Sequence, residues 1–308
     1  MPAVSVIMPV YNREALVKEA IESILSQTYI DFEFIILNDG STDNTKDIVS
    51  NYSDNRIKII HLPCNCGIAT ARNIGLKYST GKYIAVMDSD DICLPTRLER
   101  QVEYLEENPD VHILGTHGIK RSNNKERPFQ HFTQDAIIKA QLLTMGATAL
   151  FHPSTMMRTD FLQDNNLLYP NKTTDEDQAL WIEAVSAGAK FSILPEKLLI
   201  YRRHDGNITS QKNKEMVIQH EEGKTPLREK LLSMYYPELT YSEVQSIAKV
   251  MKKGYSLSPR EAYKAIFAYE KSLRFPQSIY GESKEMVSNI LKAHIDNLIR
   301  ALNNTLKK

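Results

Sequence analysis

The stretch YIAVMDSDD, residues 83–91, decides how this sequence is interpreted. Its first five residues form a short, continuously apolar run, which predicts a buried strand. Three carboxylates, Asp88, Asp90 and Asp91, follow where that strand ends. Extended geometry places Asp88 and Asp90 on one side of the backbone and Asp91 on the other. Two carboxylates on one side of a strand end suit a hard divalent cation that also holds diphosphate oxygens, and a solvated acidic turn is the alternative interpretation.

Similar strand-like runs surround this stretch and alternate with helical patterns through the first 115 residues. The predicted strands are 4–8, 32–38, 57–61, 83–87 and 111–115, and the predicted helices are 13–26, 42–51, 69–78 and 95–106. Apolar strands that alternate with helices predict an α/β fold whose mostly parallel central sheet is covered on both faces. In such a sheet, ligands bind at the carboxyl ends of the strands.

Two further strand ends carry turn-forming and polar residues. The first strand runs into Pro9, Tyr11 and Asn12, where proline removes a backbone donor and the exposed backbone with the tyrosine ring is suited to hold a base. The second ends at Asp39, whose carboxylate is suited to accept a hydrogen bond from a base edge such as the N3–H of uracil. Ordinary turn chemistry is the alternative for Asp39, because Asp-Gly-Ser is common in turns.

The composition is that of a soluble globular protein, with 42% hydrophobic and 25% charged residues. The apolar runs are of strand length, so we expect no membrane span, and we see no signal peptide. The three cysteines, an odd number in a large chain, favour a reduced cytoplasmic protein over a disulfide framework.

The second half of the chain changes character twice. Residues 120–148 are predicted to be a loop-rich insertion with a short helix at 134–143, and residues 149–157, 191–194 and 198–202 are predicted strands. A helix is expected after 173–177. Amphipathic helices then follow at 227–234, 242–252, 259–272 and 285–302. We therefore divide the chain into a domain at residues 1–210 and a helical C-terminal extension at residues 211–308.

The extension is mildly basic, with 17 Lys and Arg against 11 Asp and Glu. Its amphipathic helices must bury their apolar faces against the sheet domain, against a second copy of the chain, or on a membrane surface. Its aromatic residues favour packing against protein, either within the chain or in a homo-oligomer. A weak peripheral contact with anionic lipid is the second choice.

The motifs, taken in order, resemble those of family 2 inverting glycosyltransferases, which have the GT-A fold. The resemblance lies in residues 9–12, 38–43, 67–75, 87–91, 152–158, 175–181 and 201–204. It implies sugar transfer from a nucleotide diphosphate sugar, with a UDP-sugar favoured, to a saccharide or lipid-linked acceptor, as in surface polysaccharide or glycoconjugate synthesis. It also implies Mn²⁺ or Mg²⁺ as cofactor and no nucleic-acid partner. Asn38 before Asp39 leaves uracil and guanine both open as the base.

The resemblance also assigns roles to individual residues. Asp39 binds the base, Asp88 the ribose, and Asp90 and His204 the metal ion, while Arg72 approaches the nucleotide and an acid of the Glu176-Asp177 pair is the catalytic base. The full set for nucleotide-sugar binding is Pro9, Tyr11, Asn12, Asp39, Arg72, Asp88 and Ser89.

Helical spacing selects Asp177 as the base. Leu180, Trp181 and Ala184 lie three, four and seven residues beyond Asp177, so they share its face of the helix, whereas Glu176 is turned towards solvent. A carboxylate among apolar neighbours resists ionisation and becomes a better base, although its place in the first helical turn acts in the opposite direction.

Two other functions are weighed against this one. A sugar nucleotidyltransferase needs a glycine-rich, basic phosphate loop after the first strand, and residues 9–13 stand in its place. A non-catalytic carbohydrate- or nucleotide-binding module has no need for both Asp90 and an inward Asp177, and a donor-hydrolysis assay separates it from an enzyme.

Overall fold

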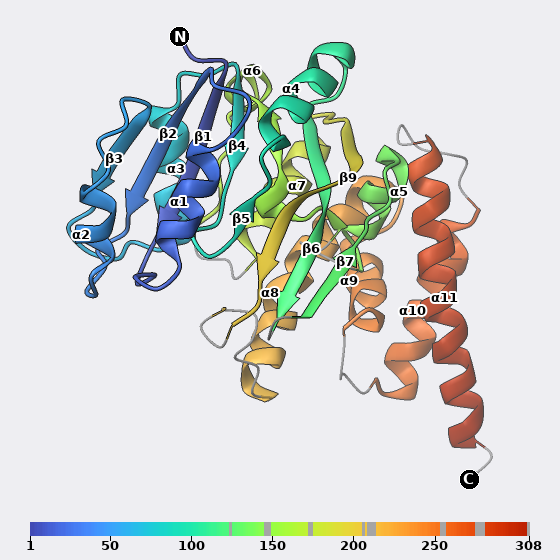
Figure 1. The fold of residues 1–308 in the computed structure, drawn as a ribbon. Helices are drawn as coiled ribbons and strands as arrows, with labels where there is room; N and C mark the ends of the chain where they lie inside the picture. The colour runs from blue at the N-terminus through green and yellow to red at the C-terminus, as the bar shows by residue number, and fades with distance from the viewer. Residues whose placement is uncertain are drawn as a thin grey trace. The chain divides into compact units, whose positions relative to one another are not determined.

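A computed structural model describes residues 1–122, 125–144, 149–171, 175–204, 207, 214–252, 257–274 and 281–306 (Figure 1). The chain divides into two compact units. The sheet unit contains residues 1–134, 150–172 and 187–211, and the helical unit contains residues 135–149, 173–186 and 212–308. The helical unit thus takes two short segments from the first 210 residues, as well as the extension.

All nine described strands belong to one sheet in the sheet unit. They are β1 (Val4–Val10), β2 (Phe32–Asn38), β3 (Ile57–His61), β4 (Tyr83–Val86), β5 (Ile92–Cys93), β6 (Ile113–Ser122), β7 (Lys125–Phe129), β8 (Met156–Arg158) and β9 (Phe191–Arg202). The strand order is β3-β2-β1-β4-β8-β6-β9-β5, and β7 pairs with β6. Strands β3, β2, β1 and β4 are mutually parallel, as are β6 and β9, whereas β5, β7 and β8 are antiparallel to their neighbours. The predicted mostly parallel sheet is confirmed.

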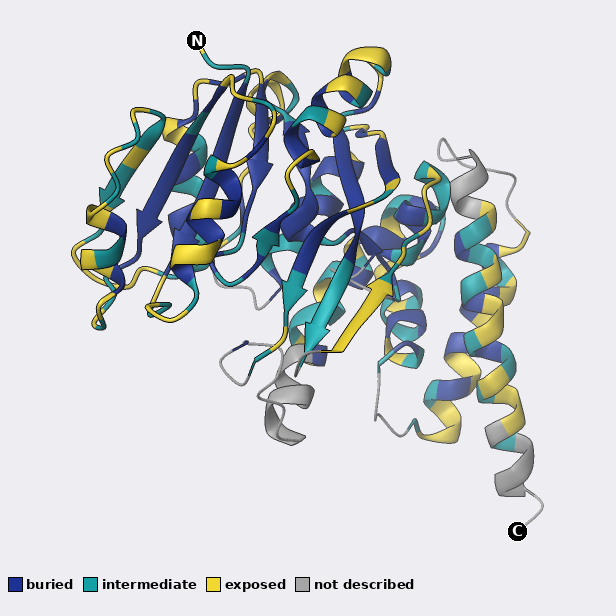
Figure 2. Ribbon diagram, viewed as in Figure 1, coloured by how far each residue is buried: buried dark blue, intermediate teal, exposed yellow. Residues whose placement is uncertain are grey.

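Helices cover both faces of the parallel strands. The described helices of this unit are α1 (Val17–Leu25), α2 (Thr45–Ser50), α3 (Ile68–Tyr78), α4 (Arg97–Glu107), η2 (His152–Ser154) and α6 (Thr159–Asp164). Apolar residues of α1 and α4 share one core with alternate residues of β1, β2 and β4, which appear dark blue in Figure 2. On the other face, Gly75 lets α3 lie against the sheet, because a Cβ there would come within 2.5 Å of Ile7. Burial on both faces explains why these strands are continuously apolar.

Several predicted boundaries were wrong. Residues 149–157 were predicted to form one strand, but the short helix η2 precedes a three-residue β8, since Pro153 lacks the N–H that a strand pairing requires. The predicted loop-rich insertion begins instead as a hairpin of β6 and β7. The two strands predicted at 191–194 and 198–202 are one strand, β9, whose register with β6 shifts near His117.

The helical unit consists of α5 (Asp135–Gln141), α7 (Glu176–Ser186), α8 (Lys214–Tyr235), α9 (Tyr241–Val250), α10 (Pro259–Ser272) and α11 (Gly281–Leu306). Capping boxes begin two of these helices, with Thr240 and Glu243 at α9 and Ser258 and Glu261 at α10. Within the unit α8 packs on α7, α9 on α10, and α11 on α5. The predicted C-terminal helices are therefore confirmed. Among the residues described, no helix has both the length and the apolar character that crossing a bilayer requires.

Candidate functional site

The turn after β4 brings three carboxylates together at the carboxyl edge of the sheet. Each of Asp88, Asp90 and Asp91 has a carboxylate oxygen, and these three atoms lie within 4.8 Å of one another. Asp91 is fully buried, whereas the side chains of Asp90 and Asp88 are 13% and 26% exposed. Ser89, between them, is also buried. The turn is closed by the Asp91 amide, which donates to the Asp88 carbonyl at 3.2 Å.

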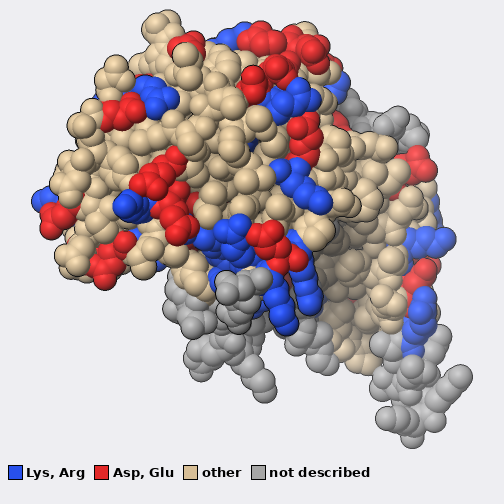
Figure 3. Space-filling model, viewed as in Figure 1, with Lys and Arg blue, Asp and Glu red and all other residues tan. Residues whose placement is uncertain are grey.

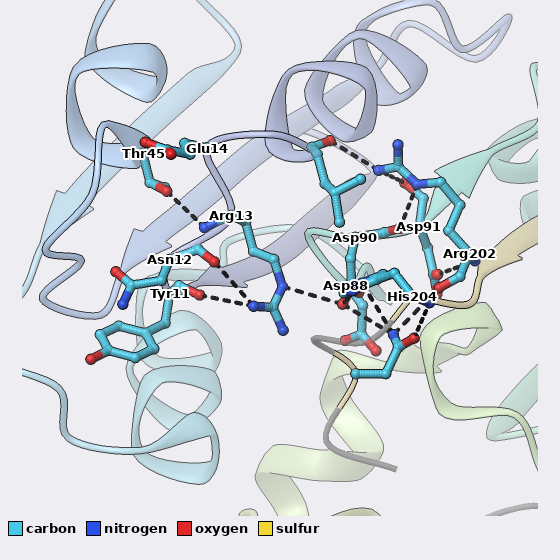
Figure 4. A network of polar contacts seen from close by, with 12 residues as sticks. Tyr11, Asn12, Arg13, Glu14, Thr45, Asp88, Asp90, Asp91, Arg202 and His204 are labelled. Atoms are coloured by element: carbon cyan, nitrogen blue, oxygen red, sulfur yellow. Dashed lines mark hydrogen bonds and ion pairs between the residues drawn. The ribbon is translucent and has the colours of Figure 1, made fainter. Parts of the chain in front are cut away.

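Asp90 is the residue on which basic groups converge (Figure 4). Its Oδ2 accepts from Nε of Arg13 at 3.3 Å and lies 3.1 Å from Nε2 of His204. His204 is positioned by Asn207, whose Oδ1 accepts from the His204 backbone amide at 2.6 Å. Residues that follow the first and last strands of the sheet unit, β1 and β9, therefore meet at one carboxylate oxygen.

Arg202, at the end of β9, holds the acidic turn in place. Its Nε donates to the backbone carbonyl of Asp90 at 2.5 Å, and its own amide donates to Oδ1 of Asp91 at 3.0 Å. The same guanidinium donates to the carbonyl of Leu16 and pairs with Glu19. Arg202 thus connects the acidic turn to the loop before α1 and to α1 itself.

The arrangement fits a hard divalent cation. Two ligands of one octahedral ion, each about 2.1 Å from it, lie about 3 Å apart, as Oδ2 of Asp90 and Nε2 of His204 do. Burial, together with the charges of Asp88 and Asp90, raises the pKa of Asp91 well above its usual range. Oδ2 of Asp91 has no hydrogen-bond partner within the described part of the chain. Oδ2 of Asp91 is thus an unused acceptor among the described residues, beside two further carboxylates, and this oxygen-rich arrangement suits a bound cation.

Arg72 and Asp88 form an ion pair across the same edge. Nη2 of Arg72, on α3, donates to Oδ1 of Asp88 at 3.1 Å, and the Arg72 guanidinium lies 5.4 Å from the centre of the Tyr169 ring. Asn73 fixes this end of α3, because its side chain exchanges two hydrogen bonds with the backbone of Tyr169. The side chain of Arg72 is 5% exposed, so the pair is largely shielded from water.

The ends of β1 and β2 are connected to each other by Asn12. Asn12 adopts a positive φ of 50°, its amide donates to Oγ of Ser41 at 3.0 Å, and its Oδ1 accepts from the Thr42 amide at 2.8 Å. Pro9 lies within β1 beside Leu37 of β2. The ring of Tyr11 is 40% exposed next to this junction. Pro9, Tyr11 and Asn12 are thus brought to the same edge as the acidic turn.

Asp39 is buried at the N-terminus of α3. Its Oδ1 accepts from the backbone amide of Cys66 at 2.8 Å and from that thiol at 3.0 Å, and its Oδ2 accepts from the Gly67 amide at 3.1 Å. Burial and the neighbouring carboxylate raise the pKa of the Cys66 thiol to about 11. Gly40 has a φ of +67°, and a Cβ there would meet the backbone of Cys64 at 2.5 Å. A glycine is therefore required at residue 40 for the loop after β2 to pass this close to the backbone of Cys64.

Asp177 lies in the first turn of α7, in the helical unit, whereas the other predicted site residues belong to the sheet unit. It is half-buried, and Leu180, Trp181 and Ala184 on its face are buried. Its neighbour Asp175 is 4% exposed and lies 3.8 Å from Nζ of Lys224, on α8.

Sequence reasoning did not assign a site role to Arg13, Arg202 or Asn207. The available signals were weak: Arg13 directly follows the predicted base-binding turn, and Arg202 and Asn207 flank His204. A lone arginine or asparagine at a strand end has many ordinary structural roles, so only the contacts to the acidic turn distinguish them.

The profile of the family described as glycosyl transferase family 2 matches residues 5–166, which is more than half of the chain. The chain belongs to glycosyl transferase family 2. An uncharacterised glycosyltransferase of Haemophilus influenzae is 36% identical to this family member over 254 residues, which cover 76% of this chain and 74% of the relative. The Escherichia coli enzyme WfgD, named UDP-Glc:alpha-D-GlcNAc-diphosphoundecaprenol beta-1,3-glucosyltransferase, is 38% identical over 139 residues, or 44% of this chain and 55% of that one.

A solved structure confirms the fold of this glycosyltransferase. Residues 1–349 of Staphylococcus aureus TarS, in a complex with UDP-GlcNAc, superpose with a TM-score of 0.66 at 20% identity, covering 99% of this chain and 91% of that one. The predicted GT-A fold is thus confirmed. The carboxyl edge that carries Asp88, Asp90 and Asp91 is accordingly the edge of a GT-A sheet.

Proposed function

We propose that this family 2 glycosyltransferase transfers a sugar, with inversion at the anomeric carbon, from a nucleotide diphosphate sugar to a hydroxyl of a saccharide or lipid-linked saccharide. The observation that carries the proposal is the convergence of His204 and Arg13 on Oδ2 of Asp90, beside the ion pair of Asp88 and Arg72. The 3.1 Å between Nε2 of His204 and Oδ2 of Asp90 is also the spacing of two ligands on one metal ion, and this supports the proposal. The proposed enzyme requires a metal ion and transfers a hexose.

The nucleotide is assigned to the edge formed by β1, β2 and β4. Asp39 receives the N3–H of the base, because its two oxygens accept three described hydrogen bonds and carboxylate oxygens offer about four acceptor sites. The exposed ring of Tyr11 flanks the base, Pro9 and Asn12 shape the turn, Asp88 binds the ribose with Ser89 beside it, and Arg72 lies near the phosphates. A uracil base, and therefore a UDP-sugar, agrees with the N3–H assignment. The donors in the names of WfgD and of the TarS complex also support UDP.

Asp90 and His204 would hold the Mn²⁺ or Mg²⁺ ion. When bound, the ion supplies positive charge that stabilises the leaving nucleoside diphosphate. Arg13 pairs with Asp90 and would place a second positive charge beside the ion. Both positive groups would then be available to the negatively charged diphosphate. Arg202 acts indirectly, since it fixes the backbone that carries Asp90 and Asp91.

Asp177 is assigned as the catalytic base. It takes the proton from the acceptor hydroxyl while that oxygen bonds to the anomeric carbon, and the bond from that carbon to the diphosphate oxygen breaks with its electron pair on the leaving group. Attack opposite to the leaving group inverts the anomeric configuration. The buried side chains of Leu180 and Trp181 lie on the same face of α7, so the carboxylate of Asp177 would act beside apolar neighbours in the first helical turn.

The acceptor is proposed to be a growing surface saccharide, and the name of WfgD supports a lipid diphosphate carrier. We place the enzyme in the cytoplasm, at the inner face of the membrane when its acceptor is lipid-linked. Residues 1–210 would carry donor binding and chemistry, and residues 211–308 would support the acceptor side. We propose no nucleic-acid partner.

A panel of UDP- and GDP-sugars, read by nucleotide release with manganese, tests the proposal. We expect release from a UDP-sugar that needs manganese, is lost in Asp90→Asn and persists in Asp47→Asn, a control that changes an exposed acid on α2. Metal-independent release, or equal release by both variants, would contradict the metal assignment. Tight UDP binding without any release across the panel and acceptor mixtures would point to a binding module.

A further inference from the structure

One face of α10 is exposed and carries aromatic and basic side chains side by side. At 100° per residue, Arg260, Tyr263, Lys264 and Phe267 fall within about 100° of arc, Arg274 follows just beyond the end of the helix, and all five are exposed. We call these five residues the α10 outer face. Tyr263 and Phe267 are each 60% exposed, although large aromatic side chains are usually more buried. They line an open groove of about 730 Å³ between α9 and α10.

The cations of this face lack acidic partners. Arg260, Lys264 and Arg274 form no ion pair with any residue that the structure describes. Two of the nearby acids are already engaged, because Glu243 pairs with Lys271 and Glu261 pairs with Lys249. Glu270, at the edge of the face, lines a different groove towards α11. The α10 outer face is therefore a positively charged surface with two aromatic side chains among its cations.

From this pattern we propose that the α10 outer face binds the surface of an anionic lipid bilayer. Tyrosine and phenylalanine rings insert at the boundary between headgroups and acyl chains, and lysine and arginine pair with lipid phosphates. A second copy of the chain is a poorer occupant, because a two-fold interface would bring the same three unpaired cations against one another. An acidic protein would satisfy the charges but leaves the two flanking aromatic rings without a reason to be exposed.

The inference rests on the proposed function only for its purpose, which is to bring the site to a membrane-borne acceptor. Two features support a surface contact over insertion: no described helix qualifies as a membrane span, and the face is narrow and largely charged. Such a contact is electrostatic, so it is expected to be reversible and to weaken as salt shortens the Debye length. It requires no sugar transfer, so it can be measured independently of activity.

Flotation of the full chain with vesicles tests the proposal. The vesicles contain phosphatidylcholine alone, or three parts of it to one part phosphatidylglycerol. We expect the protein to float only with the anionic vesicles at about 0.1 M salt and to be released at about 0.5 M. Each cation near an anionic surface contributes about fivefold to partitioning, so Arg260→Gln/Lys264→Gln/Arg274→Gln should lower it about 100-fold. Tyr263→Ser/Phe267→Ser should lower it about tenfold.

Matched variants control for charge and exposed apolar area. Lys46→Gln/Lys77→Gln/Lys125→Gln removes three exposed lysines from the sheet unit, and Ile30→Ser/Phe132→Ser removes two exposed apolar side chains there. Both should float like the natural chain. The proposal is overturned if the natural chain does not float, if it binds both vesicle types equally, or if the α10 variants float like the controls. A loss of dimer mass in the α10 variants by light scattering would assign the face to a second copy instead.

Discussion

Replacement of Arg202 by methionine is expected to destabilise the acidic turn and the sheet unit with it. The Arg202 guanidinium donates to the carbonyl of Asp90 at 2.5 Å and to the carbonyl of Leu16 at 2.9 Å. It also pairs with the carboxylate of Glu19 at 2.7 Å. The side chain is only 11% exposed, and burial lowers its pKa, so the charge is held there by these acceptors. Methionine keeps much of the apolar stem but leaves two carbonyls without their donor.

The magnitude follows from the individual contacts. A hydrogen bond from a charged donor to a carbonyl contributes about 1.5 kcal/mol, and two are lost. The pair with Glu19 adds less than about 1 kcal/mol, because that carboxylate is 64% exposed. We therefore expect Arg202→Met to lose about 3 kcal/mol of unfolding free energy, which lowers Tm by about 5 °C in a chain of this size.

Thermal unfolding followed by circular dichroism measures this loss, and manganese titration of activity reports on Asp90. The matched control is Arg203→Met, since Arg203 is exposed and its backbone amide, which the substitution keeps, donates to the carbonyl of Arg121. Arg202→Lys should be intermediate, because one ammonium cannot reproduce the fork that serves several acceptors. If Arg202→Met melts together with Arg203→Met and titrates manganese identically, Arg202 does not hold the turn.

The other predictions concern metal, base and pH. Asp90→Asn should lower the apparent manganese affinity by about 100-fold or more. It should change the unfolding free energy by less than about 1 kcal/mol, since the pair of Asp90 with Arg13 is partly exposed. Calorimetry that shows unchanged manganese affinity in a variant that melts like the natural chain would refute this prediction. Asp39 should favour UDP over CDP by about 1–3 kcal/mol, because cytosine presents an acceptor at N3, and equal calorimetric affinities would remove Asp39 from the base site. Burial, with the charges of Arg72 and Arg97, lowers the pKa of His152 in the folded protein well below 6.5. As the pH falls, this imidazole therefore takes up a proton in the unfolded chain before it does so in the folded protein, and the unfolding free energy should fall below about pH 6.5. His152→Gln, which can still accept from the Tyr169 hydroxyl, should show a shallower decline in urea midpoints between pH 7 and 5, and an unchanged slope would contradict the assignment.

The local sequence pattern was sufficient to predict the strands whose carboxyl ends form the proposed nucleotide-binding edge. Continuous apolar runs predicted β1, β2 and β4 to within a few residues, because a strand that is buried on both faces carries apolar side chains on both. The edge strand β3 was predicted with its bounds correct, although it is only partly buried. Polar residues placed directly after those strands then predicted one functional edge, since parallel strands end on the same side. Asp39, Asp88 and Asp90 could be selected in this way from the sequence.

Strands with short or antiparallel pairings were harder to predict. β5 has two residues and β8 has three, and each exists because a distant partner pairs with it, β9 for the first and β4 and β6 for the second. A window of sequence contains no trace of that partner. The same holds for the hairpin of β6 and β7, whose outer strand is exposed and polar.

The amino-acid sequence by itself determined the class of this protein and selected the acids that we propose for its site, because both follow from local order: apolar strands, strand-end carboxylates and helical spacing. The resemblance had already predicted His204 beside Asp90 and Arg72 near the nucleotide, whereas the tertiary structure alone decided that Arg13 and Arg202 also contact the acidic turn. Arg13 and His204 reach Oδ2 of Asp90 from 77 and 114 residues away, and Arg202 reaches its carbonyl from 112. Such contacts depend on how the strands are ordered in the sheet, and no local preference of a single arginine or histidine encodes that order.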